Sequence, residues 1–201
     1  MRLLNRARPA KESDSITVVS GLPRSGTSLM MRMLEAGGIP PLTDRERAAD
    51  GDNPNGYYEF ERVKQLPKGD VGWLPEAQGK AVKVISALLH HLPAGYPYRI
   101  VFMRRAVEEV LASQRAMLAH RGQAEGAAGD AELAALFDQH LAQVDAWLAS
   151  RPDVACLKLS YNDLLADPAG VTAELARFLD RRLDAERMVA VVNPSLYRNR
   201  Q

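Results

Sequence analysis

Short apolar runs alternate along this chain with longer segments in which apolar residues recur every three or four positions. A short β-branched run is typical of a buried strand, whereas the longer spacing indicates an amphipathic helix. Strands are predicted at 16–20, 81–86, 98–103 and 154–159. Helices are predicted at 27–36, 107–120, 131–150, 169–179 and 184–192, and 57–66 is compatible with a short one. The chain thus consists of strands separated by helices.

This alternation predicts an α/β fold of three layers, in which a mainly parallel central sheet is flanked by helices. Residues 16–201 are expected to form a single domain after a flexible N-terminal tail, 1–15. Ligands of such sheets bind beyond the carboxyl ends of the strands. Segments 21–27, 104–105 and 160–161 should therefore lie near one edge of the sheet.

The composition is that of an ordinary globular protein, with 201 residues of which 46 % are hydrophobic and 25 % charged. The 26 basic and 25 acidic residues give a net charge of +1, which argues against a protein that coats nucleic acid. Only six of the basic residues are lysines. Arginine suits phosphate and sulfate groups, although a GC-rich genome would produce the same bias.

A cytoplasmic location is expected. The single cysteine, Cys156, excludes an internal disulfide and fits a reducing compartment. No apolar run approaches the roughly 20 residues that cross a bilayer, so no membrane span is predicted. Residues 1–15 also lack the apolar stretch of a signal peptide.

The segment between the first strand and the first helix has the spacing of a phosphate-binding loop, G-x-x-x-x-G-K-[ST]. Backbone N–H groups at such a turn and helix start attract anions. The lysine of nucleotide hydrolases is replaced by Thr27, and the nearest cation is Arg24. No predicted strand ends in a well-placed acidic residue for magnesium, so no metal site is predicted. The alternative is a glycine turn that merely joins strand to helix.

The loop Gly21-Leu22-Pro23-Arg24-Ser25-Gly26-Thr27-Ser28 closely resembles the 5′-phosphosulfate loop of sulfotransferases, which use 3′-phosphoadenosine 5′-phosphosulfate (PAPS). Its Pro-Arg-Ser-Gly-Thr form is similar to that of bacterial and tyrosylprotein sulfotransferases. The resemblance implies a P-loop-NTPase-like fold and PAPS as cofactor. It also implies that the cofactor contacts Pro23, Arg24, Ser25, Gly26, Thr27 and Ser28.

Two further motifs strengthen this resemblance. Members of the family bind the 3′-phosphate with an arginine at a strand end and a serine eight residues later, which Arg105 and Ser113 match. A forked guanidinium and a hydroxyl can bind the same phosphate. Residues 159–168 resemble a family stretch whose tyrosine lies near the adenine, which implies this position for Tyr161.

The resemblance covers roughly residues 16–200, because segments 53–59 and 194–198 are also similar to short bacterial members. The glycine-rich C-terminal cofactor loop of cytosolic sulfotransferases has no equivalent in this chain. Arg198 and Arg200 are hypothetical replacements for its cationic role. The acceptor, a small molecule, glycan or peptide, is not identified by the sequence, and its specificity is expected to reside in 42–80 and 120–131.

The resemblance implies transfer of a sulfuryl group from PAPS to a hydroxyl or amine. Arg24 would stabilise charge on the bridging oxygen, and a general base would take the proton of the acceptor. Glu59 is the preferred base, with Glu46 and Glu61 as competitors and a solvated surface role as the alternative. Lys83, in the second predicted strand, is compatible with a side chain that points toward the same site, and an edge strand or an upward-facing strand end explains a lysine there equally well. The four histidines are interpreted as packing or surface residues: His90, His91, His120 and His140.

Two other functions stay open at this point. One is a P-loop kinase or nucleotide hydrolase, which the missing lysine and magnesium ligand disfavour. The other is a sulfotransferase-like module that binds nucleotide without catalysis.

Overall fold

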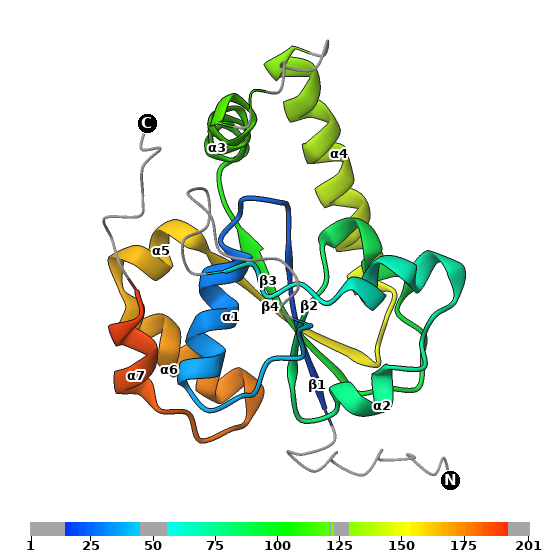
Figure 1. The fold of residues 1–201 in the computed structure, drawn as a ribbon, viewed down its shortest axis with the longest axis vertical. Coiled ribbons are helices and arrows are strands. Elements are labelled where there is room, and N and C mark those ends of the chain that lie inside the picture. Colours follow the sequence, from blue (N-terminus) through cyan, green and yellow to red (C-terminus); the bar gives the residue numbers. More distant parts are fainter. Residues whose placement is uncertain (1–14, 45–55, 121, 123–128, 193–201) are drawn as a thin grey trace, which may run out of the picture.

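The computed structural model describes residues 15–44, 56–120, 122 and 129–192. Within these residues a four-stranded sheet has the order β2-β1-β3-β4, and all neighbouring strands are parallel. The strands are β1 (Ile16–Gly21), β2 (Ala81–Lys83), β3 (Tyr98–Arg104) and β4 (Val154–Ser160). The predicted α/β fold with a parallel sheet and flanking helices is confirmed (Figure 1).

Helices cover both faces of the sheet (Figure 1). On one face α1 (Thr27–Ala36), α6 (Pro168–Leu179) and α7 (Ala185–Ala190) enclose a core around Val19 and Val101. The other face buries Val18, Ile100 and Phe102. It is covered by η1 (Glu61–Lys68), α2 (Leu74–Ala77), η2 (Ser86–His91) and α4 (Asp130–Ala149). Because successive strand residues point to opposite faces, each strand supplies both cores.

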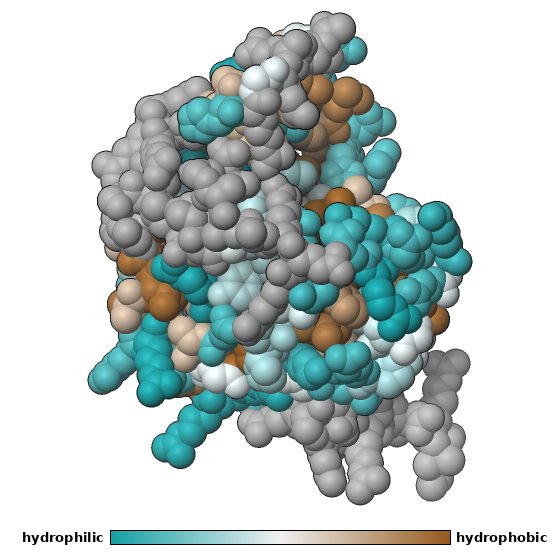
Figure 2. Space-filling view, viewed as in Figure 1, coloured by the Kyte–Doolittle hydropathy of each residue, from teal (hydrophilic) through white to brown (hydrophobic). Residues whose placement is uncertain are grey.

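Helices α3 (Val107–His120) and α4 pack on each other and rise beyond the carboxyl edge of the sheet (Figure 1). Figure 2 shows hydrophobic surface on the projecting part of α4, where Leu136 is 52 % exposed. No helix in the described part of the chain is both long and apolar enough to cross a membrane.

Several elements differ from the sequence prediction, including the unpredicted helix α2. Strand β2 stops at Lys83 instead of residue 86, because the backbone turns into the 3₁₀ helix η2 after one more hydrogen bond, from Val84 N–H to the Val19 carbonyl. The short helix expected within 57–66 is also a 3₁₀ helix, and it begins later, at Glu61. Helix α5 (Tyr161–Ala166) was not predicted, and the Ser160 side chain caps it by accepting a hydrogen bond from Asp163 N–H. The predicted tail, 1–15, lies almost entirely outside the described residues.

Candidate functional site

The glycine loop is a tight turn between β1 and α1. A Cβ atom on Gly21 would lie 2.5 Å from Ser25 Oγ and 2.6 Å from the Met103 carbonyl oxygen. Gly26 has a φ of 97°, in the left-handed region that favours glycine. Ser25 Oγ donates a 2.7 Å hydrogen bond to the Leu22 carbonyl, which closes the turn. Both glycines of the predicted motif are therefore required by the shape of the loop.

The turn presents the N-terminus of α1 at the carboxyl end of β1. In the residues that the structure describes, no side chain caps this helix, and its first turn holds no acidic residue. Its first N–H groups and the positive end of its dipole can therefore receive an anion. Pro23 is exposed in the turn, and Arg24 adopts a left-handed φ of 71°. Such a conformation in a non-glycine residue costs free energy and is enriched at functional sites.

The second predicted motif meets this loop directly. Strands β1 and β3 end side by side, with Gly21 opposite Met103. Arg24 Nε donates a 3.0 Å hydrogen bond to Ser113 Oγ on α3. Arg105 Nη1 donates a 3.2 Å hydrogen bond to the Arg24 carbonyl. The fold therefore brings Arg24, Arg105 and Ser113 together.

Arg105 has a buried acidic partner that sequence reasoning missed. Its Nε lies 2.7 Å from Glu109 Oε2, and the two side chains are 7 % and 9 % exposed. The other carboxylate oxygen of Glu109 accepts a 3.2 Å hydrogen bond from Asn162 Nδ2. The four-residue spacing of Arg105 and Glu109 at the start of a helix was the available signal.

Tyr161 packs against the glycine loop and Arg105. Its ring centroid lies 4.7 Å from the Arg105 guanidinium carbon. A Cβ on Gly26 would lie 2.4 Å from Tyr161 Cδ2, so the ring rests on the loop backbone. Burial raises the pKa of the Tyr161 hydroxyl. The ring of Tyr161 thus contacts both Arg105 and the backbone of the glycine loop.

Segment 56–60 approaches the loop from the other side, through Lys83 at the end of β2. Lys83 Nζ donates a 2.7 Å hydrogen bond to the Tyr57 carbonyl and a 3.4 Å one to Ser28 Oγ. Tyr58 is anchored to α1, because its hydroxyl donates a 2.6 Å hydrogen bond to Glu35 Oε2. This arrangement places an ammonium group beside the first turn of α1.

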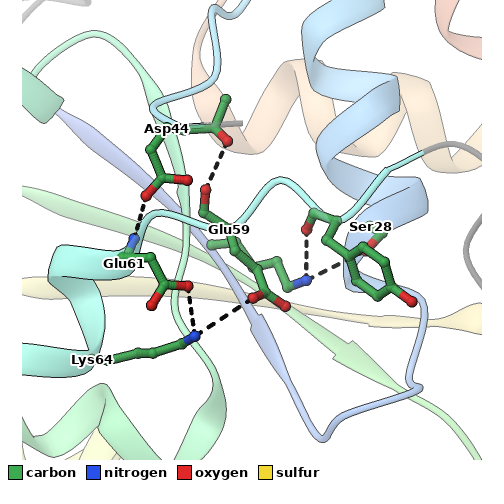
Figure 3. A network of polar contacts seen from close by, with 8 residues as sticks. Ser28, Asp44, Glu59, Glu61 and Lys64 are labelled. Carbon is green, nitrogen blue, oxygen red and sulfur yellow. Dashed lines mark hydrogen bonds and ion pairs between the residues drawn. The ribbon is translucent and has the colours of Figure 1, made fainter. Parts of the chain in front are cut away.

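Glu59 lies in the same network, which Figure 3 shows. Its carbonyl accepts a 2.7 Å hydrogen bond from Thr43 Oγ1, and its Oε2 lies 3.7 Å from Lys64 Nζ. Its side chain is 22 % exposed, against 44 % for Glu61, whose carboxylate lies 2.6 Å from the same lysine. In Figure 3 the Glu59 carboxylate lies between Lys64 and Ser28.

The remaining candidates include two residues that the structure does not describe and the histidines of η2 and α4. Glu46 and Arg198 lie outside the described residues. His140 is hydrogen-bonded to Ser86, and the ring centroids of His90 and His91 lie 3.9 Å apart, with the rings tilted by 40°. Among the residues that the structure describes, no group of three or more acidic, histidine or cysteine side chains is arranged to hold a metal ion.

Comparison with known protein families gives a match over most of the chain. The profile of the family described as the sulfotransferase domain matches residues 14–201. A comparison with curated proteins gives no match.

Two solved structures have the same fold. The sulfotransferase domain of the Synechococcus PCC 7002 olefin synthase is 15 % identical, with a TM-score of 0.57 over 95 % of this chain and 82 % of that one. Retinol dehydratase, crystallised with androsterone and the inactive cofactor PAP, is 18 % identical, with a TM-score of 0.52 over 94 % of this chain and 65 % of that one.

Proposed function

Because the chain belongs to the sulfotransferase domain family, we propose that it transfers a sulfuryl group from PAPS to a hydroxyl or amine acceptor. The observation that carries this proposal is the contact between the two anion-binding motifs. Arg24 in the loop and Ser113 on α3 share a 3.0 Å hydrogen bond, although they are 89 residues apart in the chain. A ligand with two anionic groups is the natural partner of such a paired site.

The residues present fit the nucleotide. The loop offers an uncapped helix N-terminus beside the left-handed Arg24, and Arg105 supplies a second guanidinium at the adjoining strand end. The 5′-phosphosulfate is assigned to the loop, through the residues Pro23, Arg24, Ser25, Gly26, Thr27 and Ser28. The 3′-phosphate is assigned to Arg105 and Ser113, and the adenine to the side of Tyr161. Arg198 is proposed as an additional contact from the C-terminal segment.

When bound, PAPS supplies the sulfuryl group. The role of the protein is to position the reacting groups and to neutralise charge, which is also the role of enzymes that transfer phosphoryl groups. Arg24 and the N–H groups of Gly26 and Thr27 donate toward the anionic oxygens, whereas the Ser25 N–H donates a 3.2 Å hydrogen bond to the Leu22 carbonyl. Lys83 adds positive charge beside Ser28. Glu59 accepts the proton of the acceptor as general base.

Turnover of radiolabelled PAPS on a panel of alcohols, phenols and amines tests this function. We expect Glu59→Gln to lower kcat by about 100-fold or more, because a positioned base contributes at least that much. Glu61→Gln is the matched control, since its carboxylate contacts the same Lys64 but is more exposed. It should stay near the wild-type rate, whereas full turnover by Glu59→Gln would refute the assignment of the base.

Nucleotide binding separates the alternatives. Binding of 3′,5′-adenosine bisphosphate (PAP) without turnover on any acceptor would favour a non-catalytic module. No PAP binding at millimolar concentration would refute both the enzyme and the nucleotide-binding module. Magnesium-dependent hydrolysis of ATP would favour a kinase or nucleotide hydrolase instead.

A further inference from the structure

The guanidinium of Arg105 is held by groups of the protein before any ligand binds. Its Nε lies 2.7 Å from Glu109 Oε2, and its Nη1 donates a 3.2 Å hydrogen bond to the Arg24 carbonyl. Its guanidinium carbon lies 4.7 Å from the centroid of the Tyr161 ring. Of these three partners, only the Glu109 carboxylate is anionic, so it occupies a position beside Arg105 that suits an anionic ligand.

Glu109 also lies beside the second group that is assigned to the 3′-phosphate. Glu109 and Ser113 are four residues apart on α3, so their side chains are neighbours on one face of this helix. Both side chains are buried. The carboxylate therefore adjoins both Arg105 and Ser113, and a phosphate bound by these two residues would lie close to a negative charge.

The carboxylate of Glu109 is fixed in this place by further contacts. Asn162 Nδ2 donates a 3.2 Å hydrogen bond to its Oε1, while Oε2 faces Arg105. Glu109 lies in the first turn of α3, where the positive end of the helix dipole stabilises an anion. These contacts are made without a ligand, and they keep the charge of Glu109 next to the site.

We propose that Glu109 is a positioning residue that holds Arg105 in the empty site and weakens the binding of the 3′-phosphate. The inference rests on the proposed function and concerns how tightly the nucleotide is held. A phosphate is attracted by Arg105 and repelled by Glu109, so the carboxylate cancels part of the attraction. The weaker hold on the 3′-phosphate allows PAP to leave after the sulfuryl group has been transferred.

Calorimetric titration of PAP and of 5′-AMP into wild type, Glu109→Gln and Glu108→Gln tests the proposal. We expect Glu109→Gln to bind PAP at least about tenfold more tightly than wild type, because like charges about 6 Å apart repel appreciably even at an effective dielectric constant of about 20. The affinity for 5′-AMP, which has no 3′-phosphate, should rise by less than about threefold. Glu108→Gln is the matched control, since it removes the same charge from an exposed neighbour in the same helical turn. It should leave both affinities within about threefold of wild type.

A purely structural role of Glu109 would give the opposite result, because loss of the ion pair would leave Arg105 misplaced for the phosphate. An unchanged or weaker PAP affinity in Glu109→Gln, or an equal gain for both nucleotides, would therefore overturn the proposal. These outcomes leave the proposed function intact as long as wild type binds PAP more tightly than 5′-AMP. No PAP binding by wild type would instead refute the proposed function itself.

Asn162 provides a second test in case Glu109→Gln does not fold. Its side chain is exposed, so substitutions there should be tolerated. Asn162→Asp adds a carboxylate beside Glu109, whereas its matched control, Asn162→Ala, removes only the amide. We expect Asn162→Asp to bind PAP at least about threefold more weakly than Asn162→Ala does, with a smaller difference for 5′-AMP. Equal PAP affinities of these two variants would show that negative charge at this place does not act on the 3′-phosphate, and would overturn the proposal.

Discussion

The buried ion pair beside the loop gives the most quantitative prediction. Arg105 and Glu109 are both more than nine-tenths buried, and their closest atoms are 2.7 Å apart. Glu109→Gln removes the negative charge and keeps the shape of the side chain. The guanidinium of Arg105 then stays buried and loses its ion pair with this carboxylate.

The expected cost is about 3 kcal/mol of unfolding free energy. Two unit charges about 4 Å apart attract by about 4 kcal/mol at an effective dielectric constant of about 20. Removing one partner of a buried pair typically costs about 3–5 kcal/mol. We expect a cost at the lower end of this range because the glutamine oxygen still accepts a hydrogen bond from Arg105.

Urea unfolding of wild type, Glu109→Gln and Glu108→Gln measures this cost. Glu108 is the neighbouring residue in the first turn of α3, and it is exposed, so its substitution should change stability by no more than about 0.5 kcal/mol. Saturating PAP should recover part of the Glu109→Gln loss, because a phosphate replaces the carboxylate beside Arg105. If Glu109→Gln and Glu108→Gln unfold at the same urea concentration, the reasoning about the buried pair is wrong.

Two further predictions concern the loop and the cysteine. In thermal unfolding, Gly26→Ala should lower the stability of the protein by about 2 kcal/mol more than Gly38→Ala does. Both glycines have a left-handed φ, but only a Cβ on residue 26 would collide with Tyr161. Equal effects would show that the ring moves away without cost. Burial raises the pKa of the Cys156 thiol to about 11, so the reactive thiolate is scarce at pH 8 and increases as the pH approaches that value. A thiol reagent should therefore modify native protein far more slowly than urea-unfolded protein at pH 8, and equal rates would contradict the assigned burial.

Local pattern was sufficient to predict the part of the fold that forms the loop. The β-branched run of β1, two spaced glycines and the apolar face of α1 lie within 21 residues of chain, and each is a short-range signal. The alternation of strands and helices then placed Arg105 and Tyr161 near this loop, because the carboxyl ends of parallel strands share one edge.

Contacts between segments that are distant in the chain cannot be predicted from the local sequence pattern. The apolar run at 81–86 does not distinguish a long strand from a strand that turns into η2, because its residue types are compatible with both. Ser86 and His140 are 54 residues apart, so their hydrogen bond depends on how α4 returns to the sheet. His140 was therefore interpreted as a packing or surface residue, although it lines a groove.

Discrimination between PAP and 5′-AMP by the wild-type protein tests the central claim most directly. The two nucleotides differ only in the 3′-phosphate, which is assigned to Arg105 and Ser113. Hydrogen bonds to a charged group contribute about 1.5–3 kcal/mol each, so two contacts correspond to an affinity difference of about 100-fold or more. Calorimetry should therefore show PAP binding at least about 100-fold more tightly than 5′-AMP. Equal affinities, or no binding of either nucleotide, would contradict a PAPS site at this edge of the sheet.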